Sequence, residues 1–265
     1  MTRQPLAGKT ALVTGASSGL GIDFARQLAQ RGASLVLVAR REERLRAVQA
    51  ELQAASPQRV DVIPLDLSVE DAPRQLFDQL QAAGRQIDAL VNNAGFGLHG
   101  RFTDIPWHKQ RQMLQLDLIA LTHLTRLFVQ DMLPRRSGYI LQVASIGAYQ
   151  PSPTYAVYAA AKTYVLNFSQ ALNYELRGSG VSVTTVSPGV TATEFLQVAG
   201  QAPSLYQRLT MMQSAAVARI GIDAMLRRRA SVVTGWFNAV AVRMMYHLLP
   251  RGLATAIANL TMTMD

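Results

Sequence analysis

Cysteine is absent from the chain. Its absence excludes disulfides, thiolate metal sites and cysteine nucleophiles, and it fits a reducing compartment, so we expect a cytoplasmic protein. The histidines, at positions 99, 108, 123 and 247, also lack the spacing of metal ligands. We therefore predict no metal site.

Long apolar runs are missing as well. No segment holds 18 or more uninterrupted apolar residues, so a membrane-spanning helix is not expected.

Acidic residues are few: 17 Asp and Glu stand against 26 Lys and Arg, a net charge of +9 that could favour a phosphorylated cofactor, an acidic membrane or nucleic acid. Because the arginines are scattered and no nucleic-acid-binding motif is found, we predict no nucleic-acid partner.

What the chain does contain is apolar segments that alternate with helical patterns over its whole length. Hydrophobic residues make up 49% of it, enough for a substantial core. The alternation predicts an α/β fold, a doubly wound parallel sheet with helices on both faces. We predict one domain over residues 1–265, with 236–265 as a C-terminal helical extension. The predicted strands are 9–13, 33–39, 60–64, 87–91, 139–144, 181–186 and 230–234.

A glycine-rich turn follows the first predicted strand and precedes a helical pattern that starts at Ile22. Glycines let a backbone turn tightly and approach a ligand, and a helix N-terminus offers free N–H groups. The spacing G-x-x-x-G-x-G therefore indicates a phosphate site, although such glycines can also serve only as a turn. Its predicted cofactor-binding residues are Gly15, Ser17, Ser18, Gly19, Leu20 and Gly21.

The second predicted strand ends in Arg40 and Arg41, with no acid before Glu42. An acid there would bind a ribose 2′-hydroxyl, whereas an arginine accommodates a 2′-phosphate. This favours NADP(H) over NAD(H). The alternative is that both arginines simply begin an exposed helix over 41–54. Further along, Ser68 is a predicted N-cap for a helix that ends near residue 83.

Polar residues follow the fourth predicted strand in the run 92–95, NNAG, which fits a cofactor-facing turn or a plain one. A long helix is predicted next, over 107–133. Asp117 lies inside it in the apolar stretch MLQLDLIAL, where a lone acid is usually solvent-facing or paired.

Tyr158 and Lys162 are four residues apart in a helix predicted over about 154–177, so they share one face. A lysine ammonium beside a tyrosine favours the phenolate, lowers the tyrosine pKa and makes the pair a proton donor and acceptor. Ser145 ends the preceding strand and could hydrogen-bond a substrate oxygen. Pairs with this spacing also occur by chance, so the weight of this one depends on the rest of the chain.

Two apolar segments follow the sixth predicted strand. Residues 194–213 have the apolar cover of a substrate lid. The tail 236–265 is predicted to form two helices separated at 250–252, which we interpret as packing or a subunit contact. A membrane-surface helix is the second interpretation, given Arg243, Arg251 and the aromatic residues.

Taken together, these motifs resemble the short-chain dehydrogenase/reductase family, in its shorter-chain oxidoreductase branch. The resemblance covers about residues 8–234 and implies a Rossmann-type fold with hydride transfer between NADP(H) and a carbonyl or secondary alcohol. Family members often pair through the long helices, so we expect a homo-oligomer. The motifs that carry the resemblance are the glycine turn, Asn92-Asn93-Ala94-Gly95, Ser145, Tyr158-x-x-x-Lys162 and Pro188-Gly189-x-x-x-Thr193.

The resemblance also implies residue roles. Tyr158 would be the general acid/base, Lys162 would lower its pKa and hold the nicotinamide ribose, and Ser145 would orient the substrate carbonyl. Arg40 would bind the 2′-phosphate. The other implied cofactor-binding residues are Asp66 and Leu67 at the adenine, Asn92, Ala94 and Gly95, then Pro188, Gly189, Val190 and Thr191, and Thr193 at the carboxamide side.

One position departs from the family pattern: Asp117 stands where an asparagine usually holds a water near the active lysine. An aspartate accepts hydrogen bonds but donates none unless it is protonated. Its negative charge would also oppose phenolate formation at Tyr158. We therefore predict a retuned proton relay with a pH optimum shifted upward.

The leading hypothesis is an NADP(H)-dependent reductase or dehydrogenase. The apolar lid and tail suggest a hydrophobic substrate such as a lipid-like, steroid-like or aromatic carbonyl compound. A non-catalytic NADP(H)-binding redox sensor is the main alternative, and a membrane-surface or scaffold protein is a third.

Overall fold

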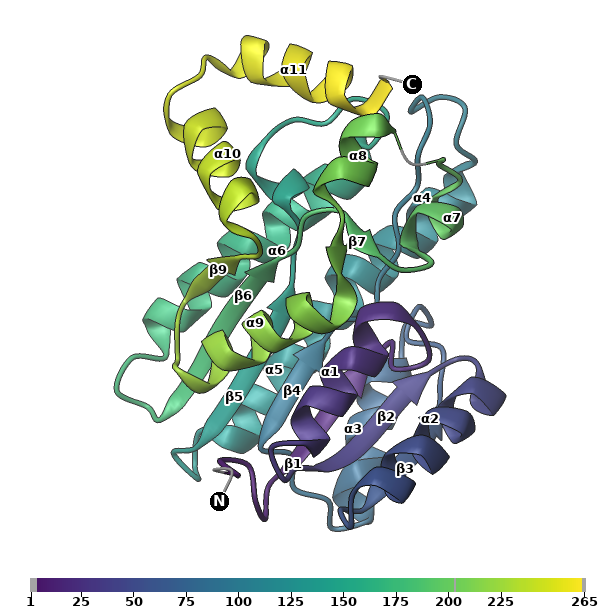
Figure 1. The fold of residues 1–265 in the computed structure, drawn as a ribbon. Helices are drawn as coiled ribbons and strands as arrows, with labels where there is room; N and C mark the ends of the chain where they lie inside the picture. Colours follow the sequence, from purple (N-terminus) through teal and green to yellow (C-terminus); the bar gives the residue numbers. More distant parts are fainter. Residues whose placement is uncertain (1–3, 203, 264–265) are drawn as a thin grey trace.

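One seven-stranded parallel sheet organises the molecule (Figure 1). The computed structural model describes residues 4–202 and 204–263. The strand order is β3-β2-β1-β4-β5-β6-β9, and every neighbouring pair is parallel. The predicted doubly wound sheet is confirmed. The strands are β1 (Thr10–Thr14), β2 (Ser34–Ala39), β3 (Val60–Pro64), β4 (Ala89–Asn92), β5 (Gly138–Val143), β6 (Val181–Ser187) and β9 (Ser231–Val233).

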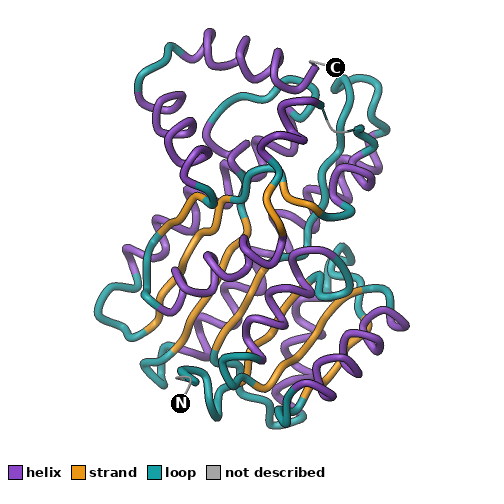
Figure 2. The backbone as a smooth tube through the Cα atoms, in the orientation of Figure 1, coloured by secondary structure: helices purple, strands orange, loops and turns teal. Residues whose placement is uncertain are grey.

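Helices cover both faces of this sheet (Figures 1 and 2). Residues of α1, α2 and α9 share one buried apolar cluster with the strands, and residues of α3 and α5 share a second. Two layers of helices around a parallel sheet are what right-handed strand–helix–strand crossovers produce. The helices are α1 (Gly19–Ala29), α2 (Glu42–Ala55), α3 (Ala72–Ala82), α4 (Trp107–Leu114), α5 (Leu121–Met132), α6 (Ala156–Glu175) and α9 (Ser214–Leu226).

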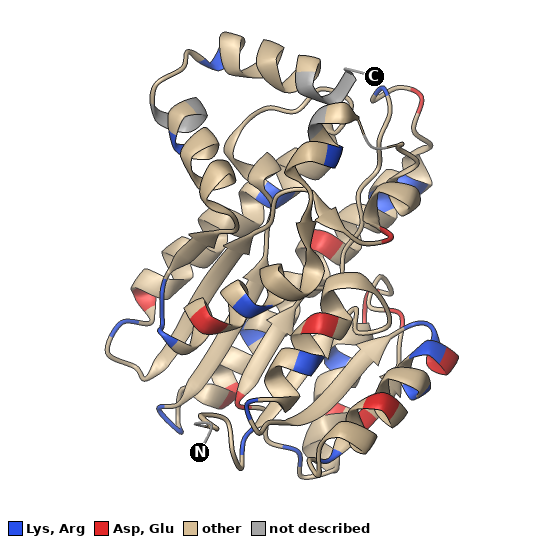
Figure 3. Cartoon of the chain, in the orientation of Figure 1, with Lys and Arg blue, Asp and Glu red and all other residues tan. Residues whose placement is uncertain are grey.

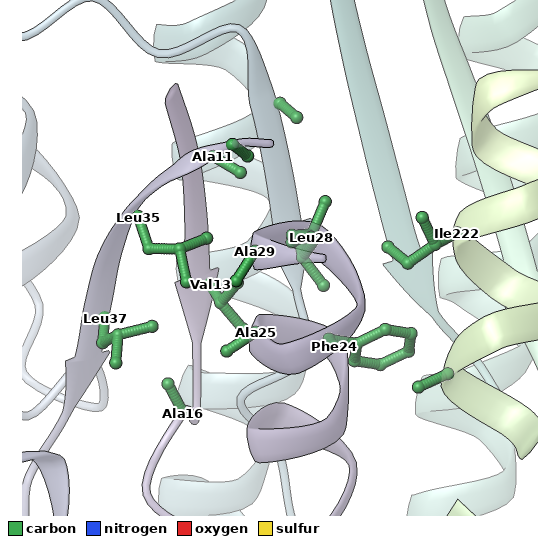
Figure 4. Packing of buried hydrophobic residues seen from close by; sticks show 14 of the residues in the cluster. Ala11, Val13, Ala16, Phe24, Ala25, Leu28, Ala29, Leu35, Leu37 and Ile222 are labelled. Carbon is green, nitrogen blue, oxygen red and sulfur yellow. The ribbon is translucent and has the colours of Figure 1, made fainter. Parts of the chain in front are cut away.

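The strands send alternate side chains to the two faces. Ala11 and Val13 of β1 belong to the cluster under α1, whereas Leu12 between them belongs to the cluster under α3 and α5. Figure 4 shows the first of these clusters, with Phe24 of α1 beside Ile222 of α9. Because both faces are buried, most of the strands are largely apolar, which is why short apolar runs identified them in the sequence. The exception is β6, which also buries Ser182, Thr184 and Thr185.

Two predicted boundaries are wrong. Helix α1 begins at Gly19, earlier than the predicted Ile22, because the glycine turn itself forms the first helical residues. Ser68 does not cap α3, which begins at Ala72. Instead the Asp66 carboxylate accepts hydrogen bonds from the backbone N–H of Ser68 at 2.9 Å and from its hydroxyl at 2.7 Å, closing a turn before the helix.

The predicted long helix over 107–133 is interrupted by a π-helical turn, Gln115–Ala120, between α4 and α5. Such single wide turns are uncommon and occur often at functional sites. The apolar periodicity of the sequence does not distinguish this wider turn, with its i→i+5 hydrogen bonds, from an ordinary α-helix. The turn carries Asp117, which it buries completely.

Apart from α9 and β9, the segments after β6 gather over the carboxyl ends of the strands, at the end of the molecule away from the N-terminus (Figures 1 and 2). The tail forms the two predicted helices, separated at residues 248–250. Helix α10 contacts the 3₁₀ turn Ile146–Tyr149, and α11 contacts α8. The elements of this end are β7 (Thr191–Ala192), α7 (Phe195–Ala199), α8 (Leu205–Thr210), β8 (Met212–Gln213), α10 (Trp236–His247) and α11 (Arg251–Thr263).

Phe24 should be a large contributor to stability. Its ring is fully buried and packs closely on Gly221 of α9, where a Cβ would lie 3.2 Å from the Phe24 Cε1, a tight contact. We expect Phe24→Ala to lower the free energy of unfolding by about 3–5 kcal/mol, measured by urea denaturation. The control Val69→Ala, at an exposed position, should change it by less than about 0.5 kcal/mol. Equal effects of the two variants would contradict this packing.

Candidate active site

A cavity of about 390 Å³ opens at the carboxyl ends of β2, β1, β4, β5 and β6. In doubly wound sheets, ligands bind in the crevice at this edge, where the strand order reverses. Most of the residues predicted from the sequence line this cavity; three do not, namely Gly21, Asn92 and Asp117. The predicted residues that line it are Gly15, Ser17, Ser18, Gly19, Leu20, Arg40, Asp66, Leu67, Ala94, Gly95, Ser145, Tyr158, Lys162, Pro188, Gly189, Val190, Thr191 and Thr193.

The glycine turn needs its glycines for two different reasons. Gly15 and Gly19 have φ angles of +66° and +51°, a region that side chains disfavour. Gly21 lies beneath the turn rather than in the cavity, and a Cβ on it would lie 2.1 Å from the Gly15 carbonyl oxygen. Ser18 makes no side-chain cap bond at the start of α1. The Gly21 N–H donates to the Ser18 carbonyl at 3.2 Å, and no side chain of Ser18 competes for the N–H groups of Gly19 and Leu20, which an anion could accept.

The turn after β4 is tied to β1 through Thr14. The Thr14 hydroxyl oxygen accepts from the backbone N–H groups of Asn93 at 3.0 Å and Ala94 at 2.9 Å. Asn92 is buried, and its side-chain amide donates to the Thr125 hydroxyl at 3.1 Å. It therefore packs toward α5 instead of the cavity, and the residue that lines the cavity is the neighbouring Asn93.

Ser145, Tyr158 and Lys162 meet at the β5 side of the cavity. Ser145 lies two residues after the end of β5 and caps the following 3₁₀ turn, with its hydroxyl oxygen accepting from the Gly147 N–H at 3.1 Å. Tyr158 and Lys162 lie one turn apart on α6, and the Lys162 ammonium is 5.6 Å from the centre of the Tyr158 ring. The same ammonium donates to the Val143 carbonyl at 3.2 Å, which fixes it under the end of β5.

Asp117 forms a buried ion pair with Lys162. Its Oδ2 lies 3.1 Å from the Lys162 Nζ, and its Oδ1 accepts from the Phe96 N–H at 3.2 Å. The π-helical turn brings the carboxylate so close to Gly95 that a Cβ there would lie 2.8 Å from Oδ1. Asp117 is therefore paired beneath the cavity, and of the two environments expected from the sequence the solvent-facing one is wrong.

Burial and charge act in opposite directions on these groups. Burial raises the pKa of the Tyr158 hydroxyl; the Lys162 ammonium and a hydrogen bond with Ser145 oppose this rise, and Asp117 adds to it. Burial alone would lower the pKa of Lys162, but the Asp117 carboxylate raises it above its usual value. Burial raises the pKa of Asp117 itself, against the attraction of Lys162. The Lys162 ammonium thus interacts with the Asp117 carboxylate as well as with the Tyr158 hydroxyl.

At the β2 side of the cavity, three arginines meet two acids. The Arg40 guanidinium lies 3.7 Å from the Asp66 carboxylate and is exposed. Arg44 contacts Glu194 at 2.7 Å, and Arg41 contacts the same carboxylate at 3.4 Å. Glu194 was missed in the sequence, where its only sign is an acid directly after Thr193. These ion pairs connect the start of the predicted lid to α2, across the cavity.

Aromatic side chains form the wall above Tyr158. The rings of Tyr155 and Phe195 have centroids 5.7 Å and 5.4 Å from that of Tyr158. The Tyr155 hydroxyl donates to the Gln201 side-chain oxygen at 2.6 Å, which ties the segment after α7 to α6. Sequence reasoning missed Tyr155 and Phe195, although Tyr155 lies only three residues before Tyr158.

Comparison with known proteins places the chain in a family. A family model described as short chain dehydrogenase matches residues 9–203. Sulfoacetaldehyde reductase 2 of Chromohalobacter salexigens is 36% identical over 216 residues, which cover 79% of this chain and 85% of that protein. This chain belongs to the short-chain dehydrogenase/reductase family, as its motifs indicated, and that family is one of oxidoreductases.

Solved structures agree in fold. A short-chain dehydrogenase from Sphingobium yanoikuyae in complex with NADPH has a TM-score of 0.80 and 30% identity, and covers 88% of this chain and 92% of its own. A family member from Burkholderia phymatum in complex with NAD has a TM-score of 0.81 and 25% identity, with 91% and 93% covered. Neighbours with either cofactor thus share this fold.

The ion pair can be tested without any turnover. Lys162→Met removes the ammonium, keeps the shape and leaves the Asp117 carboxylate buried without its cation. We expect a loss of about 3–5 kcal/mol in the free energy of unfolding at neutral pH, measured by urea denaturation. Because an unpaired buried carboxyl has a raised pKa and is neutral below it, the deficit should shrink as the pH falls.

The matched control is the double variant Asp117→Asn, Lys162→Met, which removes both charges. It should recover most of the lost stability and lose the pH dependence of the deficit. A double variant as unstable as Lys162→Met would show that packing, and not the unpaired carboxylate, causes the effect.

Proposed function

We propose that this protein is an NADP(H)-dependent oxidoreductase that interconverts a hydrophobic carbonyl compound and its alcohol. The observation that carries the proposal is a single cavity with two ends. Ser145, Tyr158 and Lys162 line it at β5, and the glycine turn with Arg40 lines it at the ends of β1 and β2. An extended dinucleotide bound along these strand ends would join a phosphate site to a proton donor.

The residues present fit a dinucleotide. The tight turn at Gly15 and Gly19 and the uncapped start of α1 suit a pyrophosphate, and Asp66 and Leu67 line the cavity beside β2, where an adenine would lie. Arg40 and Arg41 give this end a positive charge, and the first acid after them in the chain is Glu42. These arginines support NADP(H) over NAD(H), because they can neutralise a 2′-phosphate.

The protein's own part in the reaction is to move a proton. The cofactor, when bound, supplies or receives the hydride. In the reductive direction, the Tyr158 hydroxyl donates its proton to the substrate carbonyl oxygen, and the Ser145 hydroxyl donates a hydrogen bond to the same oxygen. The Lys162 ammonium stabilises the phenolate that is left, because it lies 5.6 Å from the centre of the Tyr158 ring.

The wall of the cavity supports an apolar substrate. Side chains from the predicted lid and from the loop after β5 line the cavity near Tyr158, and most are apolar. A ketone or aldehyde with an aromatic, steroid-like or acyl body would bury apolar surface against them. The apolar and aromatic lining residues are Ile146, Tyr155, Phe195, Leu196 and Val198.

A second candidate function is a redox sensor that binds NADP(H) without turnover. The observation that favours it is the contact of Lys162 with Asp117 at 3.1 Å, which engages the ammonium that would activate Tyr158. In that case the cavity would bind cofactor, while the tyrosine would stay a neutral phenol with a raised pKa.

Turnover separates the two functions. NADPH oxidation should be followed by absorbance with aldehydes and ketones from small to lipid-like, beside an NADH control. We expect a preference for NADPH and for the larger apolar substrates. Tyr158→Phe should lower kcat by about 10²–10⁴-fold, because it removes the proton donor, while NADPH binding measured by fluorescence stays unchanged. Tight NADPH binding without turnover on any substrate would instead support the sensor.

Asp117→Asn tests the retuned relay. In alcohol oxidation Tyr158 must first lose its proton, so the rate rises with pH through the pKa of this residue. The Asp117 carboxylate raises that pKa; its removal leaves the Lys162 charge uncompensated and lowers it. We expect the rise in kcat to move to lower pH in the variant. A pH–rate profile identical to that of the wild type would contradict this role of Asp117.

A further inference from the structure

Helix α10 exposes large apolar side chains to solvent. Trp236, Phe237, Val240 and Met244 recur at the spacing of one helix face and are 80%, 48%, 51% and 53% exposed. Leu248, one turn beyond Met244, is 71% exposed. We call these five residues the α10 stripe. A helix that packs only on its own molecule would turn such a stripe inward.

The inward side of α10 is fixed by a polar residue instead. Asn238 is buried, and its side-chain amide donates to the Thr234 carbonyl at 3.0 Å. A Cβ on Gly189 would lie 2.3 Å from the same amide nitrogen. This side of α10 therefore packs closely on the turn after β6, and a rotation of the helix that buried the α10 stripe would lose this contact.

The charge around the α10 stripe has one sign. Residues 236–263 contain no Asp or Glu, whereas Arg243 lies beside Met244 on the exposed side of α10 and Arg251 starts α11, also exposed. Figure 3 shows that the acidic residues are mostly on the helices around the sheet, away from α10 and α11. Exposed apolar and aromatic side chains with arginines and without acids match an anionic lipid surface.

We propose that the α10 stripe docks this protein on the surface of an anionic lipid bilayer, with Trp236 and Phe237 in the headgroup boundary and Arg243 against lipid phosphates. None of the helices in the described part of the chain has the length and apolar composition to cross a bilayer. The stripe therefore lies in the plane of the interface. Docking itself does not depend on the proposed reaction.

A second copy of this chain fits the α10 stripe less well. In a two-fold contact the same surface faces itself, so the α10 stripe with Arg243 and Arg251 would face a second surface of the same charge, with no acid between residues 236 and 263 to pair the arginines. A bilayer offers an anionic partner for each arginine. It also suits the position of the stripe, since α10 and the apolar lid segment lie at the same end of the molecule (Figure 1). On the proposed function, a hydrophobic carbonyl compound could pass from the bilayer to the cavity without crossing water.

Sedimentation with vesicles tests the docking. The full chain is mixed with phosphatidylcholine vesicles that contain either no or about 30 mol% phosphatidylglycerol, at low and high salt. We expect binding that needs the anionic lipid and weakens with salt. The variant Trp236→Ser, Val240→Ser should bind at least about tenfold more weakly, and Arg243→Gln about fivefold. The control Val69→Ser, also at an exposed apolar position, should bind like the wild type.

Light scattering without lipid, thermal unfolding and NADPH turnover on a water-soluble substrate are measured on the same proteins. An unchanged unfolding temperature would show that a variant that no longer binds vesicles is still folded. Turnover is measured separately from vesicle binding, so failure of the proposed reaction can be told from failure of the docking. Absence of sedimentation with either vesicle would overturn the proposal. Self-association that disappears only in the Trp236→Ser, Val240→Ser variant, without vesicle binding, would assign the α10 stripe to a contact between copies and overturn it equally.

Discussion

The buried ion pair between Lys162 and Asp117 determines how the rest of the site is arranged. It joins α6 to the π-helical turn below the cavity, and the Phe96 N–H and the Val143 carbonyl complete its contacts. An ammonium without a carboxylate at this depth would lose its proton, and a carboxylate alone would gain one. The pair therefore keeps a cation next to Tyr158, while it weakens the effect of that cation on the tyrosine.

Much of this architecture could be predicted from the sequence because the constraints involved are local. A strand buried on both faces must be apolar, so β1, β2 and β5 stand out as short runs. The turn between β1 and α1 requires glycine for backbone reasons that no side chain can replace, as the positive φ of Gly15 shows. Chain order then places every such strand end at one edge of the sheet, which brings residues as distant as Gly15 and Tyr158 to one cavity.

The features that escaped the sequence depend on partners far along the chain. Asn92 and Asn93 are neighbours of the same residue type, so the sequence cannot tell which of them faces the cavity. The hydrogen bond to Thr125 of α5 turns Asn92 away from it. Glu194 becomes recognisable only when α2 lies beside it. The π-helical turn has the same apolar sequence pattern as an α-helix. What distinguishes it in the structure is the buried Asp117, which is paired with the Lys162 ammonium of α6.

The carboxyl edge of the sheet also explains where apolar surface remains exposed. The two layers of helices bury their apolar sides on the strands, but within the described residues only the two short strands β7 and β8 lie beyond the carboxyl edge of the main sheet, too little to receive the side chains of α7, α8 and α10. These elements can bury only small or polar contacts, such as Asn238 at Gly189, and their larger apolar side chains are left to line the cavity or to face outward. The apolar wall around Tyr158 and the α10 stripe thus have one physical origin: this end of the fold has more apolar side chains than its core can bury. Such an end favours a ligand, a lipid surface or both, because each covers apolar area that the chain itself cannot.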